Sequence, residues 1–308
     1  MARREIMYLL IVNPKAGRGQ SVIKAQAIES QLEAHGIKYD TVFTTGVNCG
    51  LGIAKEFCSI KGQELKGIIG IGGDGTIQEI VAGMADVFPL SEKIPIPLCI
   101  CPAGSGNDFI LSVLGKKCKK ADKNFLPNLM SNNKKAIDII TANNRAYLNI
   151  GNVGIDAWIV KNAETKKKEY GHRAYLAAVY KSIMSYKPTN LVIEANGTVF
   201  DGAFTLVAVC NGQYYGGGLQ VSPSARIDDG KITLCIVESM SKIKTMAIFP
   251  SLMIKKHIYL KTVSFHECES VKITFLDDGG ILCLDGNLSP AKGSIQFKIY
   301  KQVLDIIV

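Results

Sequence analysis

Short apolar runs and segments with helical spacing of apolar residues alternate along the first third of the chain. Four runs predict strands: Tyr8–Val12, Tyr39–Thr44, Ile68–Ile71 and Pro97–Cys101. Three further segments predict helices: Ser21–His35, Ile53–Ile60 and about Thr76–Ala85. This alternation is typical of a parallel sheet covered by helices, so we predict an α/β domain. The strands are continuous apolar runs, as expected for strands that are buried on both faces.

Beyond about residue 135, strands predominate. Seven segments have the pattern of strands with turn signals between them: Ala136–Thr141, Ala146–Ile150, Leu191–Glu194, Thr198–Cys210, Lys231–Val237, Val271–Phe275 and Ile281–Leu284. Two helical stretches interrupt them, roughly Ala163–Met184 and Lys242–Lys255. Runs of strands indicate a second, mostly antiparallel β domain. We place the boundary near Lys134.

Composition and charge narrow the class of protein. Of 308 residues, 47% are apolar and 20% are charged, which is typical of a globular protein and excludes a mainly disordered chain. The formal net charge of +9 favours partners that carry phosphate. Nine cysteines without a CxxC pair, several of them inside apolar runs, predict buried, reduced thiols and a cytoplasmic location. No apolar run reaches the length of about 18 residues that a transmembrane helix needs.

Three glycine-rich turns follow three of the predicted strands. They are Asn13–Gly19, Gly72–Thr76 and Pro102–Asp108, and each opens a helix. Open α/β sheets bind ligands at this edge, the carboxyl ends of their strands. Glycine lets main-chain N–H groups approach phosphate oxygens, and a helix N-terminus adds a favourable partial charge. Thr76 and Ser105 can add hydroxyl donors, so the three turns together predict a phosphate-binding site.

Other nucleotide motifs fit less well. The segment Gly70–Gly75 has the GxGxxG pattern of dinucleotide-binding folds, but the acidic residue expected about 20 positions later would be Glu92, in a proline-rich stretch. A dehydrogenase is therefore the weaker interpretation, and a Walker A loop is absent. The histidines are scattered without the spacing of metal ligands, and we expect Trp158 to belong to the core.

Together the turns resemble motifs of the diacylglycerol kinase catalytic-domain family, especially its soluble bacterial lipid kinases, with sphingosine and ceramide kinases as more distant relatives. NPKAGRG looks like the first loop of the family, GGDGTIQE like its nucleotide-binding signature and PAGSGNDF like its third loop. In the second half, Gly216–Gly230 is similar to the family's GGG…DG stretch, and Cys283–Asn287 stands where the family has Asp-Gly-Glu. GGDGT also occurs in NAD kinases, so the other four matches favour lipid kinases.

The resemblance implies that ATP lies in a cleft between two domains. Nine residues would then bind the nucleotide: Asn13, Thr45, Gly72, Gly73, Asp74, Gly75, Thr76, Ser105 and Asn107. Asp74 would act near the phosphates through Mg²⁺. A structural Mg²⁺ would be held by the Asp229 carboxylate with the main-chain carbonyls of Arg226 and Lys231, although without the family context the Asp-Asp-Gly sequence favours a plain turn.

The resemblance also implies a domain arrangement. The last strand, Gln302–Ile307, would return to the first domain. Residues 1–134 plus about 295–308 would then form the nucleotide-binding α/β domain, and residues 135–294 the β-rich lipid-substrate domain.

One residue departs from the family pattern. Asn287 stands where the family has a glutamate that acts as general base on the lipid hydroxyl. An amide cannot take up this proton, and loss of a positioned base lowers the rate about 10²–10⁴-fold. The loss is smaller where the hydroxyl proton leaves late in the reaction. Asp285 or a water could substitute, the acceptor could differ, or catalysis could be impaired. Asp285–Asn287 is also typical of a hairpin turn, which we expect to face the cleft.

We therefore expect an ATP- and Mg²⁺-dependent kinase that phosphorylates a hydroxyl of diacylglycerol or a similar lipid, with Asp74, Asn287 and Asp285 as catalytic residues. The alternatives are a catalytically impaired nucleotide- or lipid-binding homologue, or a kinase of a soluble polyol or dinucleotide.

Basic clusters suggest peripheral contact with a membrane that supplies the lipid. They are Lys116–Lys120, Lys166–Lys168 with His172 and Arg173, and Lys255–His257. Nucleic acid is not expected as a partner, because no aromatic residues are interleaved with the lysine runs. The oligomeric state stays open.

Overall fold

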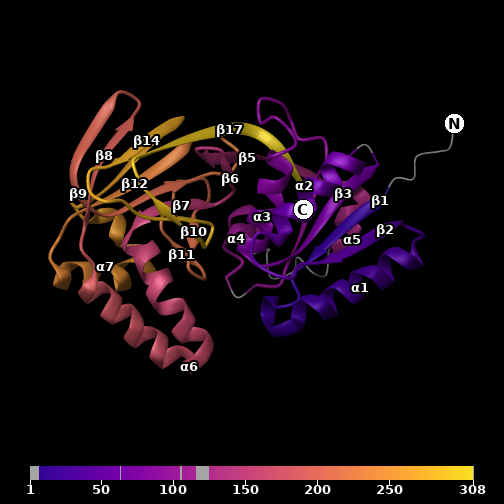
Figure 1. Cartoon of the computed structure of the whole chain (residues 1–308), viewed down its shortest axis with the longest axis horizontal. Coiled ribbons are helices and arrows are strands. Elements are labelled where there is room, and N and C mark those ends of the chain that lie inside the picture. The colour runs from indigo at the N-terminus through magenta and orange to yellow at the C-terminus, as the bar shows by residue number, and fades with distance from the viewer. Residues whose placement is uncertain (1–6, 63, 105, 116–124, 308) are drawn as a thin grey trace.

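The computed structural model describes residues 7–62, 64–104, 106–115 and 125–307 (Figure 1). An α/β half and a β-rich half lie side by side, and long strands connect them. This confirms the predicted fold class. In the described part of the chain, no helix combines the length and the apolar character needed to cross a membrane.

The α/β half is built on parallel strands. They are β1 (Met7–Val12), β2 (Tyr39–Phe43), β3 (Leu65–Gly72) and β4 (Leu98–Pro102), in the spatial order β4–β3–β1–β2. The helices of this half are η1 (Ala16–Gly19), α1 (Gln20–Ala34), α2 (Cys49–Lys61), α3 (Asp74–Ala85), α4 (Asp108–Leu114) and α5 (Phe125–Ser131). All four strands and all three helices predicted here are therefore present, with ends shifted by a few residues.

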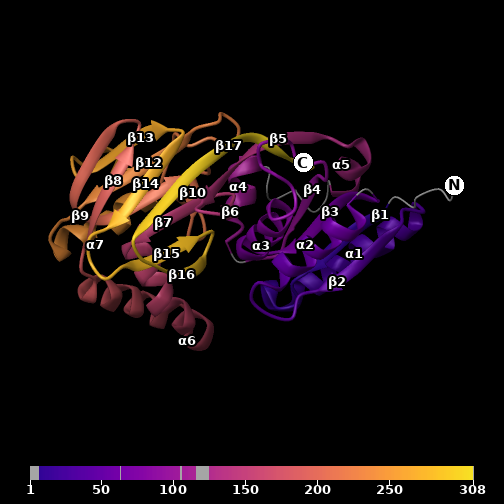
Figure 2. The ribbon, with the colours of Figure 1, turned by 45° about the horizontal axis from the view of Figure 1, so that its top comes forward.

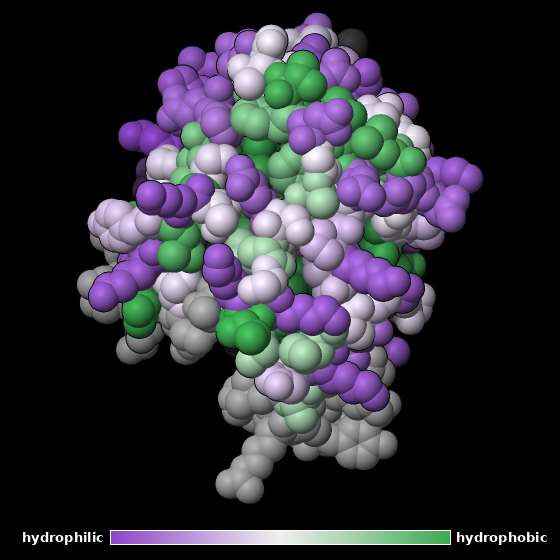
Figure 3. Space-filling model, turned by 90° about the vertical axis from the view of Figure 1, so that its left-hand side faces the viewer, coloured by the Kyte–Doolittle hydropathy of each residue, from purple (hydrophilic) through white to green (hydrophobic). Residues whose placement is uncertain are grey.

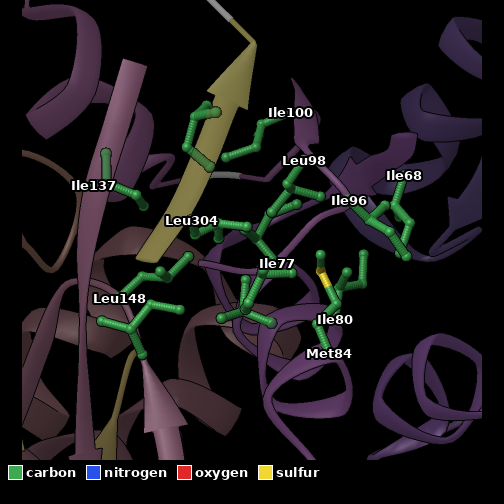
Figure 4. Close-up of a cluster of buried hydrophobic side chains, with 14 of the residues drawn as sticks. Ile68, Ile77, Ile80, Met84, Ile96, Leu98, Ile100, Ile137, Leu148 and Leu304 are labelled. Carbon is green, nitrogen blue, oxygen red and sulfur yellow. The ribbon is translucent and has the colours of Figure 1, made fainter. Parts of the chain in front are cut away.

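Alternation of side chains along the buried strands explains why helices cover both faces of the sheet. Leu9 and Ile11 belong to the core cluster that α2, α3 and α4 cover, whereas Leu10 and Val12 belong to the cluster under α1 and α5. Figure 4 shows the first cluster, in which Ile77, Ile80 and Met84 of α3 share one helix face.

The β-rich half is antiparallel. Its longer strands are β5 (Lys134–Ala142), β7 (Ile150–Gly154), β8 (Thr189–Ala195), β9 (Thr198–Cys210), β12 (Ile232–Glu238), β13 (Val263–Cys268), β14 (Ser270–Phe275), β15 (Gly280–Leu284) and β16 (Asn287–Ala291). Short strands are β6 (Arg145–Tyr147), β10 (Tyr214–Tyr215) and β11 (Leu219–Gln220), and the helices are α6 (Ile155–Ser185), α7 (Lys242–Met253) and η4 (His257–Tyr259). At the outer end of this half, hydrophobic side chains stand in small groups among hydrophilic ones (Figure 3).

The last strand, β17 (Ser294–Ile307), connects the two halves (Figure 2). Its first part pairs with β14, most of its length pairs with β5, and Ile306 and Ile307 pair in parallel with Leu98 and Cys99 of β4. The expected return of Gln302–Ile307 to the α/β half is confirmed. Because β5 and β17 make one sheet continuous through both halves, the domain boundary near Lys134 stays a prediction.

Helix α6 doubles back on itself. Trp158 Nε1 donates to Ser185 Oγ at 3.4 Å, although 27 residues separate them. A straight helix would hold these residues about 40 Å apart. Ile159 packs with Val179 and Ile183 between the two arms. The sequence placed the start of this helix too late, at Ala163, and its assignment of Trp158 to the core was wrong, because this side chain is partly exposed and lines a cavity.

Candidate active site

The three glycine-rich turns meet at one place. A Cβ atom on Gly17 would lie 2.4 Å from the carbonyl oxygen of Ala103, and one on Gly104 would lie 2.6 Å from the Cα of Gly73. The main chains of the first and third turns, and of the second and third, therefore touch where only glycine fits. The recess between the second and third turns holds only about 10 Å³, so little space separates them. The predicted convergence of the turns is confirmed.

Two asparagines fix the shape of these turns. Asn13 Nδ2 donates to Thr76 Oγ1 at 2.9 Å, which connects the first turn to the second. Asn107 lies in the left-handed region with φ 55°, and its amide accepts from Gly104 N and donates to Gly104 O, both at 3.0 Å. Both side chains therefore lie at the predicted phosphate site. Ser105, which we expected there as well, lies outside the described residues.

Asp74 connects the second turn to the third. Its Oδ1 accepts from Phe109 N at 2.9 Å, and its Oδ2 accepts from Asp108 N at 3.1 Å. The carboxylate thus satisfies two of the main-chain N–H groups that the start of α4 leaves without helical partners. Each oxygen has further lone pairs, which are suitable for a hard cation such as Mg²⁺.

Thr45 lies in the loop between β2 and α2. It is exposed, and its Oγ1 lies 3.7 Å from Cys49 Sγ. The loop after β2 is held by a residue that sequence reasoning did not single out. Buried Glu79 accepts from Asn48 N at 2.9 Å and from Gly50 N at 3.0 Å. The position of Glu79 at the end of GGDGTIQE could have indicated this role, because an acidic residue buried in a helix next to a phosphate motif needs a hydrogen-bond partner.

Asp108 joins the two halves of the molecule at the site. Its Oδ2 accepts from Gly217 N at 2.9 Å and its Oδ1 from Gly218 N at 2.6 Å. Residues Gly216–Gly218 all have positive φ, so their N–H groups can converge on one carboxylate. The glycine stretch of the β-rich half therefore packs against the third turn. The sequence did not single out Asp108 as a functional residue, although it ends the PAGSGND motif.

Asn287 lies opposite the second turn, in an orientation fixed by Gln78. Its Nδ2 donates to Gln78 Oε1 at 2.6 Å, and Gln78 Nε2 donates to Ala146 O at 2.8 Å. A turn of the Gln78 amide by 180° would lose its bond to the Ala146 carbonyl. The Oδ1 of Asn287 then points toward the turn, 3.4 Å from the position of a Cβ on Gly75.

Asp285 stabilises the hairpin turn between β15 and β16. Its φ is 47°, and its two oxygens accept from the amides of Leu148, Asn149 and Ile150 at 2.8 to 3.3 Å. Burial raises the pKa of this carboxyl to about 7, and the negative charge of Asp74 contributes to the rise. The predicted turn is confirmed. A carboxyl with a pKa near neutrality is suited to proton transfer, but the amides occupy its oxygens.

The three residues expected at a structural Mg²⁺ form a turn. Asp229 Oδ1 accepts from Lys231 N at 3.0 Å, and Arg226 Nε contacts Asp228 Oδ1 at 3.3 Å. Asp138, which accepts from Gly230 N at 2.7 Å, lies beside them. Burial raises the pKa of Asp138, and the charges of Asp229 and Asp228 add to that effect. Lys135 and Arg226 both pair with Asp228, at 3.3 Å, whereas a second Asp229 oxygen and main-chain carbonyls have the chemistry that a hard cation prefers.

In the described part of the chain, no cluster of three or more histidine, cysteine, aspartate or glutamate side chains has the form of a metal site. The basic cluster Lys116–Lys120 lies outside the described residues, and so do the side chains of Lys166–Lys168, His172 and Arg173.

Two family models match the chain. Residues 7–142 match the diacylglycerol kinase catalytic domain, and residues 150–308 match the YegS C-terminal NAD kinase beta sandwich-like domain. The first match contains all three glycine-rich turns. The second contains Asp285, Asn287 and the Asp229 turn.

The chain is similar in sequence to individual proteins of the same kind. A diacylglycerol kinase of Bacillus subtilis (strain 168) is 26% identical over 276 residues, which is 89% of this chain and 86% of the relative. A protein of Shewanella frigidimarina, whose name describes it as a YegS-like lipid kinase, is 27% identical over 187 residues, or 60% of this chain and 59% of that protein. The chain thus spans less than two thirds of the second relative.

The fold is shared with a solved structure. A crystal structure titled as a diacylglycerol kinase from Bacillus anthracis str. Sterne superposes with a TM-score of 0.72 and 24% identity, covering 98% of this chain and 96% of that chain. The arrangement of an α/β half and a β-rich half is therefore that of a known fold.

Proposed function

The chain belongs to the diacylglycerol kinase catalytic-domain family, and from this premise we propose that it transfers the γ-phosphoryl group of ATP to a hydroxyl of diacylglycerol or a similar lipid. The observation that carries the proposal is the meeting of the three glycine-rich turns with Asn287 and Asp74 where the two halves touch. Phosphoryl transfer depends mainly on positioning and charge stabilisation, which such an arrangement can supply.

The turns act on the nucleotide. Main-chain N–H groups of Gly72–Gly75 and the start of α3 bind phosphate oxygens, where the helix N-terminus carries a positive partial charge. Thr76, whose Oγ1 already accepts from Asn13, keeps its own hydroxyl proton to donate. Asn107 preserves the geometry of the third turn.

Two carboxylates serve metal ions. Asp74 would hold the Mg²⁺ that accompanies the nucleotide, and Asp229 with the carbonyls of Arg226 and Lys231 would hold a structural one. When bound, Mg²⁺ neutralises charge that develops on the transferring phosphoryl group. Asp74 also keeps the third turn in place through its two amide bonds, so it has a role in the fold as well.

Asn287 positions the acceptor. Because its Nδ2 is committed to Gln78, its Oδ1 is the atom that can accept a hydrogen bond from the lipid hydroxyl. An amide orients this hydroxyl without removing its proton. The proton passes to water late in the reaction, as a loose transition state permits, because main-chain amides occupy both oxygens of Asp285. The lipid is taken from a membrane surface.

Labelled ATP, Mg²⁺ and mixed micelles of diacylglycerol test the proposal, with the wild-type protein beside Asn287→Glu and Asp74→Ala. Labelled phosphatidate from the wild type, lost in Asp74→Ala, supports it. A gain of about 10²–10⁴-fold in Asn287→Glu would show an intact site that lacks a strong base. Equal activity of the wild type and Asn287→Glu would show that another group takes the proton.

A second function is favoured by one observation, the neutral side chain at position 287. A homologue that binds nucleotide and lipid without turnover would bind ATP but label no lipid in any of these variants. A protein that binds no ATP would contradict both functions.

A further inference from the structure

A cavity of about 670 Å³ lies away from the glycine-rich turns, in the β-rich half. It opens between the two ends of α6 and the far end of the β15–β16 hairpin. Its lining consists of Gly154, Trp158, Lys161, Ser185, Tyr186, Lys187, Thr189, Asp278, Gly279, Gly280, Ile281, Pro290, Ala291 and Lys292. This volume is in the range of sites for small organic ligands.

Two aromatic rings form one wall. The rings of Trp158 and Tyr186 lie 6.5 Å apart between centroids. Hydrogen bonds hold both: Trp158 Nε1 donates to Ser185 Oγ, and Tyr186 OH lies 3.2 Å from Thr189 Oγ1. The return of α6 on itself thus brings together two aromatic residues that are 28 positions apart in the sequence.

Two glycines border the cavity on the side of the β15–β16 hairpin. Gly279 has φ 109°, and a Cβ on it would lie 2.3 Å from the carbonyl oxygen of Ala291. A Cβ on Gly280 would lie 2.7 Å from Cε1 of Phe275. Neither position accepts another residue without a shift of its neighbours, so bare main chain borders the cavity there.

The rim is positively charged. Lys161, Lys187 and Lys292 are exposed, and Asp278 is the single acid in the lining, which leaves a net charge of +2. Lys161 Nζ lies 5.8 Å from the centre of the Trp158 ring, within reach of a cation–π contact. Cationic groups above an aromatic wall fit a molecule with an apolar body and an anionic head.

We propose that this cavity binds a phosphate-bearing lipid, with the phosphate on the three lysines and the glycerol and first acyl carbons against Trp158 and Tyr186. The site is separate from the acceptor site. Ala291, at its edge, is four residues along β16 from Asn287, or about 13 Å. The proposal goes beyond the kinase function and does not depend on it.

Tryptophan fluorescence tests the proposal, because Trp158 is the single tryptophan of the chain. The whole chain, without ATP, is titrated with three lipids below their critical micelle concentrations: dihexanoyl phosphatidate, dihexanoyl phosphatidylglycerol and dihexanoyl glycerol. Inorganic phosphate is the fourth probe. We expect a saturable change with a phosphate-bearing lipid and at least tenfold weaker responses to the neutral lipid and to inorganic phosphate. Phosphatidate alone would indicate a phosphomonoester source, such as a kinase product, and both lipids would indicate the anionic lipids of a bilayer.

Variants separate the rim from the rest of the surface. The triple variant Lys161→Ala, Lys187→Ala, Lys292→Ala is expected to weaken binding at least tenfold. The matched control Lys181→Ala lies exposed on the same helix but outside the lining, and is expected to bind like the wild type. An equal response to dihexanoyl glycerol, unchanged affinity of the triple variant, or no saturable change would overturn the proposal. Because ATP is absent, these results are independent of kinase activity.

Discussion

The bond between Asn287 and Gln78 yields a prediction for stability. Asn287→Asp keeps the shape of the side chain but turns the donor Nδ2 into a carboxylate oxygen, 2.6 Å from Gln78 Oε1. The variant loses this hydrogen bond and leaves the buried Gln78 Oε1 without a donor, which costs about 1–3 kcal/mol. The free energy of unfolding should therefore fall by about 1–3 kcal/mol at pH 8, which corresponds to a fall in Tm of roughly 2–5 °C for a chain of 308 residues.

The loss should depend on pH. A protonated carboxyl can donate to Gln78 Oε1, so the fold binds that proton more tightly than the unfolded chain does, and the folded pKa of the new group is raised. For such an acid, stability is lost as pH rises from the unfolded value, about 3.9, through the folded pKa. The variant should therefore approach the wild type in acid and fall behind it as the pH rises.

Thermal unfolding of the wild type, Asn287→Asp and Asn287→Ala at several pH values between 4.5 and 8 measures this. The quantity compared is the Tm of each variant minus that of the wild type, because Asp285 also titrates in this range. Asn287→Ala removes the donor without adding a charge, so its difference should not vary with pH. A constant difference for Asn287→Asp would refute the reasoning.

Three further predictions concern the site and its support. Asp74→Ala should lower lipid phosphorylation at least 100-fold and lower the Tm, measured by labelled-lipid assay and calorimetry; activity close to wild type would remove Asp74 from the site. Burial raises the pKa of Asp156 to about 7, so the free energy of unfolding of the wild type should fall as the pH rises from 4 to 7. Asp156→Asn should make this fall less steep, as measured by urea titrations. Gly83→Ala would place a Cβ 2.3 Å from Leu51 O and should lower the free energy of unfolding by about 1–3 kcal/mol. Gly52→Ala, where a Cβ meets open space, should raise it by about 0.4–1 kcal/mol. Chemical denaturation measures both changes.

Not every strand had a signal in the sequence. Strand β13 carries Ser264, His266 and Glu267 among few apolar residues, so its hydrophobic pattern is weak. Strand β16 lies at the edge of the sheet and contains Pro290, which is compatible only with such a position. Both strands are defined by pairing with neighbours, β13 with β12 and β16 with β15, rather than by their own composition.

The sequence by itself determined the local features. Continuous apolar runs predicted the buried strands of the α/β half, the spacing of Ile77, Ile80 and Met84 predicted α3, and glycine at strand ends predicted the three turns. These features depend on residues a few positions apart, which a single stretch of chain contains.

Tertiary structure alone decided which groups face one another. Gln78 meets Asn287 across 209 positions, Asp108 meets Gly217 across 109, and Trp158 meets Ser185 through the return of α6. None of these pairs has a spacing that a helix or strand repeats. The first two pairs form because one core cluster buries hydrophobic side chains from both halves, and each polar group left at the junction must then find a partner there. The third pair forms within the β-rich half, where α6 returns on itself.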